Sequence, residues 1–330
     1  MDEFDLIAEK FLPLTDGRHE AFGLKDDGAL VPRSNGEDLV TSLDSLIEGV
    51  HFLAADPPET IGEKLLRVNL SDLAAMGARP EAYLLAVSLG QDRLKGSGYL
   101  PWMDGIVAGL RSAQLCFGLS LLGGDTTAGP GPTSFSVTIF GRVPKGRALR
   151  RDHADAGDDL YVSGSLGDGA LGLAILQDRL SGLTPRDTAT LVRAYRLPEP
   201  RLELGQALLG RDFSRAAMDL SDGLMGDVAH LARASGIKAE IFADQVPLSD
   251  PVRSVLTRQP EFADFPFGAG DDYELLFAAG PDKREKIADL SVELGVKVCR
   301  VGRLMAGQGV RLLDAGGREK AIQSASWRHF

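Results

Sequence analysis

The sequence predicts a two-domain protein of the α/β or α+β class. The first observation is length, because 330 residues are more than one domain of ordinary size usually contains. The second is composition, since 44% hydrophobic and 25% charged residues are normal for a globular chain with real cores. The third is pattern: strand-like and helix-like segments alternate in both halves, without a fixed-period repeat.

The first half of the chain alternates short apolar strands with amphipathic helices. Apolar residues at helical spacing predict a helix over residues 3–12. Pro58 opens and Gly77 closes a second predicted helix, and a third is predicted near residues 99–114. Strands are predicted at residues 29–31, 38–44, 82–89, 120–125 and 134–142.

A charged, glycine-containing segment at residues 144–159 is the predicted domain boundary, so we expect domains at residues 1–145 and 146–330. In the second domain, a strand at residues 159–163 meets a glycine-rich turn and an Ala/Leu-rich helix at residues 169–180. Further helices are predicted at residues 186–195, 200–210 and 223–235, and further strands at residues 238–243, 273–279, 296–302 and 309–313.

Charge and composition exclude several classes of protein. A net charge of -11 argues against a nucleic-acid partner, because phosphate neutralisation needs clustered Lys and Arg. No apolar run approaches the ~20 residues of a membrane helix, and the acidic start Met1–Asp5 is unlike a secretory signal. Cys116 and Cys299 predict two buried thiols rather than a disulfide or a metal pair. We therefore expect a cytoplasmic protein.

Aspartates recur at predicted strand ends and in glycine turns: Asp26, Asp27, Asp44, Asp72, Asp125, Asp219, Asp222, Asp271 and Asp272. Taken singly, most are better explained as turn or helix-capping residues. Asp72 differs, because a carboxylate beside Leu70 and Leu73 is normally paired or bound to metal. Taken together, carboxylates from separate segments can build a magnesium site, since Mg²⁺ bridges carboxylates to substrate phosphates. The acidic charge balance fits a polyanion held through cations.

Two other features leave alternatives open. The turn Ser163–Gly169 follows a predicted strand and opens a predicted helix, so its amides can either cradle phosphate or form a close-packing turn. No Lys-Ser/Thr follows it, so it is not a Walker P-loop. His51 is either a polar contact to a ligand or a strand-end histidine. Histidine spacing does not indicate zinc, and no Gly-x-Ser-x-Gly motif indicates a serine hydrolase.

Six motifs in order resemble the thiamine-monophosphate kinase family, within the aminoimidazole ribonucleotide synthetase-like group of ATP-binding proteins. They are Lys25-Asp-Asp-Gly-Ala29, Asp44-Ser-Leu-Ile-Glu-Gly-Val-His-Phe52, Val68-Asn-Leu-Ser-Asp-Leu-Ala-Ala-Met-Gly-Ala78, Gly123-Gly-Asp-Thr-Thr127, Asp219-Leu-Ser-Asp-Gly-Leu224 and Gly270-Asp-Asp-Tyr-Glu-Leu275. The third block is shared across the larger group. The Glu-Gly-Val-His-Phe and Asp-Tyr-Glu-Leu blocks favour the kinase, and the resemblance covers nearly the whole chain.

The resemblance implies a two-domain fold of the aminoimidazole ribonucleotide synthetase type. The N-terminal sheet domain would bind ATP and metal and pair with a second copy in a homodimer, and an α+β C-terminal domain would close over it. The implied activity is phosphorylation of thiamine monophosphate to thiamine diphosphate, with ATP as co-substrate and several Mg²⁺ ions. Transfer would be direct and in line, with no covalent or general-base residue assigned.

By the same resemblance, site residues fall into three groups. The implied magnesium ligands are Asp27, Ser42, the Leu43 carbonyl, Asp44, Asp72, Asp125, Asp219 and Asp222. The implied ATP contacts are Gly124, Asp125, Arg151 and Ser221, and the implied thiamine contacts are His51, Asp271 and Trp327.

The chain departs from the family pattern at a few positions. Lys25 and Gly28 replace the Gly and the first Ala of the family's Gly-Asp-Asp-Ala-Ala. Leu43 replaces a Thr, and Asp271 stands where the family usually has a substrate-contacting Glu. The C-terminal aromatic segment is shortened to Ser326–Phe330.

Two other functions remain as alternatives. One is a relative with a different acceptor, of the purine-pathway type; the selenophosphate synthetase branch is disfavoured because no Cys precedes Cys116. The other is a non-catalytic nucleotide-binding module. That alternative is disfavoured because so many aspartates in one cleft would repel each other without metal.

Overall fold

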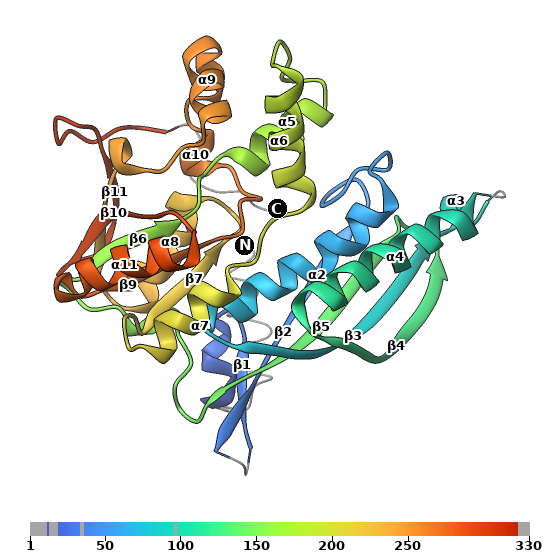
Figure 1. The fold of residues 1–330 in the computed structure, drawn as a ribbon, viewed down its shortest axis with the longest axis horizontal. Helices are drawn as coiled ribbons and strands as arrows, with labels where there is room; N and C mark the ends of the chain where they lie inside the picture. The colour runs from blue at the N-terminus through green and yellow to red at the C-terminus, as the bar shows by residue number, and fades with distance from the viewer. Residues whose placement is uncertain (1–11, 13–18, 34–35, 96–97, 323–330) are drawn as a thin grey trace.

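The chain folds into two β-sheets that meet along one long helix (Figure 1). The computed structural model describes residue 12 and residues 19–33, 36–95 and 98–322. The helix expected over residues 3–12 lies outside this range but for its last residue, and Trp327 lies outside it as well.

The first sheet has the strand order β1-β2-β5-β3-β4. Neighbouring strands are antiparallel except β3 and β4, which are parallel. The strands are β1 (Ala29–Pro32), β2 (Glu37–Ile47), β3 (Arg79–Gly90), β4 (Ser120–Gly129) and β5 (Ser134–Pro144). Helix α2 (Pro58–Ala75) packs on β2 and β5, and α4 (Tyr99–Phe117), which follows the short α3 (Gln91–Leu94), lies beside α2 (Figure 1). A 3-10 turn, η3 (His19–Leu24), precedes this sheet.

The second sheet has the order β11-β8-β10-β6-β9-β7. Its strands are β6 (Asp159–Ser163), β7 (Ala216–Leu220), β8 (Lys238–Phe242), β9 (Glu274–Ala279), β10 (Val298–Met305) and β11 (Gly309–Leu313). Its helices are α5 (Asp168–Leu176), α6 (Pro185–Arg196), α7 (Leu202–Gly210), α8 (Leu224–Ala234), α9 (Asp250–Arg258), α10 (Phe265–Gly268) and α11 (Arg284–Leu294). The 3-10 turns are η4 (Arg151–His153), η5 (Ala243–Gln245), η6 (Pro260–Phe262) and η7 (Pro281–Lys283).

Helix α2 is the element that joins the two sheets. Besides β2, β5 and α4 of the first unit it contacts α7, β7 and β9 of the second. A single hydrophobic cluster therefore includes Leu66 of α2, Leu208 of α7 and Phe277 of β9, all fully buried. Each such side chain contributes about 1.5–3 kcal/mol on burial. The junction is thus a shared core, which holds side chains from the two sheets in fixed relative positions.

The alternating pattern correctly predicted the mixed α/β class, but it missed β7, α9 and α11. Strand β7 is Ala-Ala-Met-Asp-Leu and is buried at every position, so it shows neither the alternation nor the β-branched residues that mark strands. For α9 a signal was present, because Ser249 caps the helix by accepting a hydrogen bond from the Val252 N–H. The helix expected over residues 169–180 ends at Leu176.

Strand limits and cysteine burial also differ from expectation. Strand β2 continues to Ile47 and β4 to Gly129, so Asp44 and Asp125 lie within strands rather than at their ends. The prediction of buried thiols is wrong for Cys116, which is exposed on α4, while Cys299 is half-buried. The apolar neighbours of Cys116 suggested burial, but none of the described residues covers this face of α4, where Leu115 is 77% exposed.

Among the residues that the structure describes, no helix combines the length and the apolarity that crossing a bilayer requires.

The contact between α2 and α4 depends on glycines that let the two backbones approach closely. A Cβ on Gly109 would lie 1.9 Å from the Glu59 carbonyl oxygen, and one on Gly62 would lie 2.2 Å from the Ile106 carbonyl oxygen. We predict that Gly109→Ala lowers the free energy of unfolding by about 1–3 kcal/mol through overpacking. The control is Gly98→Ala, where an added Cβ meets nothing within 4 Å. Equal urea midpoints for the two variants would refute the close-packing account.

Candidate active site

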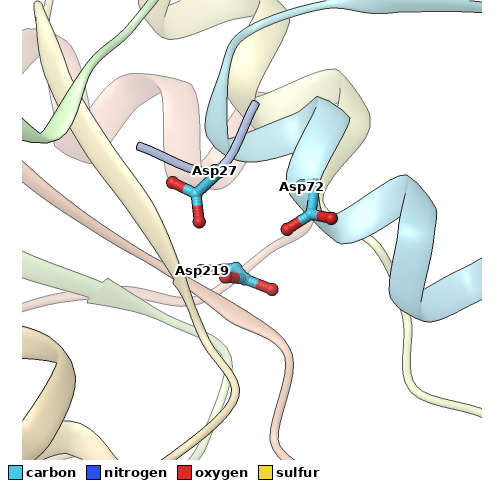
Figure 2. A group of neighbouring side chains, drawn as sticks. All are labelled: Asp27, Asp72 and Asp219. Atoms are coloured by element: carbon cyan, nitrogen blue, oxygen red, sulfur yellow. The ribbon is translucent and has the colours of Figure 1, made fainter. Parts of the chain in front are cut away.

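Three carboxylates from separate parts of the chain converge where the two sheets meet. Asp27 precedes β1, Asp72 lies on α2 and Asp219 lies on β7. One carboxylate oxygen from each lies within 4.8 Å of the others, and Figure 2 shows the three side chains pointing toward a common centre. Asp27 and Asp219 are buried. This cluster confirms that the carboxylates of distant segments are brought together.

The neighbouring elements set the positions of these carboxylates. Ser42 and Asp44 alternate with exposed Leu43 on β2, so both lie on the face toward α2. The Ser42 hydroxyl donates to Asp72 Oδ2 at 2.6 Å, and the Asp44 N–H donates to Asn69 Oδ1 at 3.1 Å. Because Asn69 and Asp72 are three residues apart, they share one face of α2. Helix and strand therefore hold the cluster rigidly.

A cavity of about 830 Å³ opens beside the cluster, a volume typical of small-molecule sites. Residues from both sheets line it, including most of the positions named from sequence. Those that line it are Asp27, Ser42, Leu43, Asp44, His51, Asp72, Arg151, Asp219, Ser221, Asp222 and Asp271.

Gly124 and Asp125 do not line this cavity. They lie on β4, whose residues are exposed, at the edge of the first sheet. Through the register Asp44–Val137–Leu85–Gly124 they sit level with Asp44 but three strands away, which is about 14 Å at the usual strand spacing. Within one chain, the structure therefore separates these two residues from the other members of the expected set.

Burial and mutual repulsion change the acidity of the cluster. Burial, reinforced by the charges of Asp27 and Asp222, raises the pKa of Asp44 to about 7. Burial and the charge of Asp27 raise the pKa of Asp219 to about 8, and burial raises the pKa of Asp72 well above its ordinary value. A hard divalent cation favours the ionised carboxylates that this cluster otherwise disfavours. The donor set, carboxylates with the Ser42 hydroxyl, fits such a cation.

Arg151 is the cation that the structure places against the cluster. Its Nε donates to Asp27 Oδ2 at 3.0 Å, and its terminal nitrogen makes a second, shorter bond to Asp27 Oδ1. Two parallel bonds of this kind fix the guanidinium plane. Arg151 therefore lies at the cavity wall and forms an ion pair with the carboxylate of Asp27.

The glycine-rich turn Ser163–Gly169 is a close-packing turn. The carboxylate of Asp272 accepts from the Gly167 N–H at 2.8 Å and from the Gly169 N–H at 3.2 Å. It thereby occupies the start of α5, where a phosphate would otherwise sit. Of the two interpretations of this turn, the phosphate cradle is wrong because a side chain of the protein already satisfies those amides.

His51 and Asp271 also form part of the cavity wall. The Ile47 N–H donates to His51 Nδ1 at 3.1 Å, so the neutral imidazole carries its proton on Nε2. Asp271 adopts a left-handed backbone conformation, with φ of 68°, which is uncommon for a residue other than glycine. The loop that carries it is tied to the end of β7 by the Asp271 N–H, which donates to the Ser221 carbonyl at 2.9 Å.

Several polar residues that support the site were not predicted from the sequence. Asn69 and Lys64 lie on α2 among buried apolar residues, and that unusual setting was the available signal. Asp227 on α8 accepts from the N–H groups of Asp222 and Gly223 and so shapes the turn that carries Asp222. No spacing pattern marks Asp227, because it reads as an ordinary first-turn helix residue.

Comparisons with known proteins find matching family models, a similar sequence and similar structures. The model of the N-terminal domain of AIR synthase related proteins matches residues 25–143, and the model of their C-terminal domain matches residues 155–315. The thiamine-monophosphate kinase of Caulobacter vibrioides is 38% identical over 99% of this chain and 90% of its own length. The structure titled AaThiL complexed with AMPPCP and TMP has a TM-score of 0.85 at 28% identity, covering 100% of this chain and 97% of its own. The thiamine-monophosphate kinase from Stenotrophomonas maltophilia K279a has a TM-score of 0.78 at 39% identity, covering 96% and 98%.

The raised pKa values predict how pH affects the stability of the metal-free protein. In the folded state Asp44 and Asp219 hold protons at a pH where the unfolded chain has lost them, because their pKa values rise from 3.8 to about 7 and about 8. Raising the pH from about 6.5 to about 8 therefore removes those protons and destabilises the fold. Half-buried His230, whose pKa is lowered to about 4 by partial burial, acts only below this window.

We expect the melting temperature of metal-free protein to fall by several degrees over that pH range, and Mg²⁺ to oppose the fall. Asp219→Asn should flatten the pH dependence, whereas Asp92→Asn, at a side chain 97% exposed, should leave it unchanged. Calorimetry measures all three. A melting temperature that rises with pH in wild-type protein would contradict the assigned charge states.

Proposed function

Because this chain belongs to the thiamine-monophosphate kinase family, we propose that it transfers the γ-phosphoryl group of ATP to thiamine monophosphate, forming thiamine diphosphate in the cytoplasm. The observation that carries the proposal is the convergence of Asp27, Asp72 and Asp219 from three segments beside a cavity of about 830 Å³. Carboxylates in such a setting suit the binding of phosphates through divalent cations.

The residues that would hold Mg²⁺ are Asp27, Ser42, the Leu43 carbonyl, Asp44, Asp72, Asp219 and Asp222, all of which line the cavity. When bound, the ions would supply the positive charge that lets two phosphate groups approach and that offsets charge on the transferred group. Ser42 holds Asp72 by its hydrogen bond of 2.6 Å, and Asn69 holds the backbone of Asp44. The chain thus orients the carboxylates before any ligand binds.

Arg151 and Ser221 would serve the nucleotide. Arg151 lines the cavity while paired with Asp27, so a small rotation would let its free N–H groups donate to a phosphate oxygen. Guanidinium donors stabilise transferring phosphoryl groups by charge-assisted hydrogen bonds. Ser221 also lines the cavity, next to the loop that carries Asp271.

On the acceptor side, His51 and Asp271 would contact the thiamine moiety, together with Trp327. Because His51 Nδ1 accepts from the Ile47 N–H, Nε2 is the donor atom of the neutral imidazole. The acceptor phosphate is already an anion at neutral pH, since the second pKa of a phosphate monoester is about 6. No general base is needed, and direct in-line transfer follows from alignment and charge compensation.

We also propose that the N-terminal unit, residues 1–145, forms a homodimer through its sheet, and that residues 146–330 close over it. Support comes from exposed apolar side chains on three strands of that sheet: Leu43 (60%), Leu84 (38%), Leu121 (47%) and Leu122 (67%). Surfaces of this kind mark protein interfaces. Gly124 and Asp125 lie on the edge strand β4, outside the cavity of their own chain. In the proposed dimer they would contribute to the cavity of the second copy.

The activity is tested by a coupled assay of the purified protein with ATP and Mg²⁺. Thiamine diphosphate should form from thiamine monophosphate and not from thiamine. Failure with both acceptors would shift the assignment to a different acceptor within the same fold.

The carboxylate cluster is tested by Asp72→Asn. Loss of one buried anionic ligand should lower kcat by about 100-fold or more while the melting temperature stays near that of wild type or rises, because a repelling charge is removed. The control is Asp92→Asn on the exposed α3. Full activity in folded Asp72→Asn protein would end the metal-site proposal.

The dimer is tested by Leu122→Glu on β4. A charge on this exposed apolar strand should halve the mass measured by light scattering and lower activity, because Asp125 would no longer reach a second copy. Val292→Glu on α11, where the side chain is 83% exposed, is the control. A wild-type mass equal to one chain would contradict the proposal.

A further inference from the structure

The side chain of Lys64 contacts two residues of the cavity wall, His51 and Asp271, without lining the cavity itself. We propose that Lys64 is a positioning residue that ties His51 and Asp271 together across the junction of the two sheets. This inference rests on the proposed function, because it concerns the acceptor side of the same cavity.

Lys64 is almost completely buried, at 2% exposure, on helix α2. Its Nζ donates to the His51 carbonyl at 3.1 Å and to Asp271 Oδ1 at 3.3 Å. The same ammonium lies 3.7 Å from the centre of the Tyr195 ring. One cation thus joins the loop after β2, the loop before β9 and helix α6.

Burying an ammonium group is costly unless it is fully paired. An apolar residue of similar length would fill the same space without that cost, so packing alone does not account for a lysine here. The three partners together satisfy the charge: a carbonyl, a carboxylate and an aromatic face. Two of these partners belong to residues that line the cavity, His51 and Asp271, whereas Lys64 itself does not line it.

The contacts of Lys64 help to fix the position of the loop that carries His51. The His51 carbonyl accepts from Lys64 Nζ and also from the Tyr195 hydroxyl at 3.2 Å. The His51 N–H donates to the Ile47 carbonyl at 2.9 Å, and the Ile47 N–H donates to His51 Nδ1 at 3.1 Å. Backbone and imidazole are therefore both anchored, and the Lys64 bond is the charged member of this set.

The contact between Lys64 and Asp271 holds a loop whose backbone is strained. Asp271 and Tyr273 both have positive φ, at 68° and 50°, which costs about 1–3 kcal/mol at each non-glycine residue. The segment is confined from the other side, because a Cβ on Gly169 would lie 2.1 Å from the Asp271 carbonyl oxygen. The ion pair with Lys64 supplies an attraction that holds the short Asp271 side chain toward α2.

Charge gives this pair a second effect. The cavity already contains the carboxylates of Asp27, Asp44, Asp72, Asp219 and Asp222, and the acceptor brings an anionic phosphate. Lys64 compensates Asp271, the carboxylate on the acceptor side. We therefore expect loss of the Lys64 charge to weaken binding of the acceptor much more than binding of ATP.

The test is steady-state kinetics of Lys64→Met, which keeps an unbranched side chain, and of Lys64→Arg. Lys64→Met should raise KM for thiamine monophosphate roughly tenfold, as expected for loss of a charge-assisted hydrogen bond, and leave KM for ATP nearly unchanged. Lys64→Arg should restore part of the loss because it restores the charge.

Arg67→Met is the matched control. Arg67 lies one turn further along α2, is also buried, and also reaches the second unit, through Glu199 at 2.7 Å. A purely structural role for Lys64 would make the two methionine variants alike, with lowered melting temperatures and the same KM for thiamine monophosphate. That result would overturn the proposal, as would equal increases of both KM values in Lys64→Met.

A double-mutant cycle separates this inference from the proposed activity. Because Lys64 acts in part through Asp271, Lys64→Met in an Asp271→Asn background should change KM for thiamine monophosphate and the melting temperature less than it does in the wild-type background. The melting temperatures measure this coupling even if the wild-type protein does not phosphorylate thiamine monophosphate. Lack of that activity would contradict the proposed function and leave the coupling between Lys64 and Asp271 testable. Strictly additive effects in the cycle would refute the coupling.

Discussion

The structure depends on one constraint: several buried carboxylates must share a small volume in which they repel each other. Asp27, Asp72 and Asp219 place oxygens within 4.8 Å of one another, and burial with neighbouring charge raises the pKa of Asp44 and Asp219 to about 7 and about 8. Such an arrangement costs stability unless protons or cations offset it. Arg151 offsets it at one edge, and the chemistry of the donor set fits divalent cations for the remainder.

The fold supplies the rigidity that this repulsion requires. Asp27 and Asp44 belong to the first sheet region, Asp219 to the second sheet, and Asp72 to the helix between them. Because α2 is packed on both sheets in one hydrophobic core, that core holds the carboxylates of the two halves close to one another. The same helix carries Lys64, so a single element contacts both the anionic cluster and the part of the cavity wall that His51 and Asp271 form.

The sequence predicts the cluster from the set of aspartates and not from its single members. Taken singly, Asp27, Asp44, Asp219 and Asp222 are explained at least as well as turn or capping residues, but together with Asp72 their order matches a family pattern. Residues that act on other residues carry no such signature. Lys64 and Asn69 read as helix residues, Asp272 reads as turn chemistry although it caps α5, and β7 lacks strand propensity. The roles of these three residues and the strand conformation of β7 all depend on tertiary contacts. Such contacts join residues far apart in the chain, so no local sequence pattern indicates them. The exposed position of Asp125 on β4 was likewise hidden, because a glycine turn was expected where the strand continues.

The most direct test of the central claim is a count of bound divalent cations. Electron paramagnetic resonance of Mn²⁺ titrated into the protein, with and without AMPPCP, gives the number of ions and their affinity for wild type and for Asp219→Asn. The account predicts saturable binding by wild-type protein that AMPPCP strengthens and that Asp219→Asn weakens at least tenfold, since a direct ligand is removed. Equal Mn²⁺ binding by the two proteins would show that the cluster is not a metal site and would contradict the account.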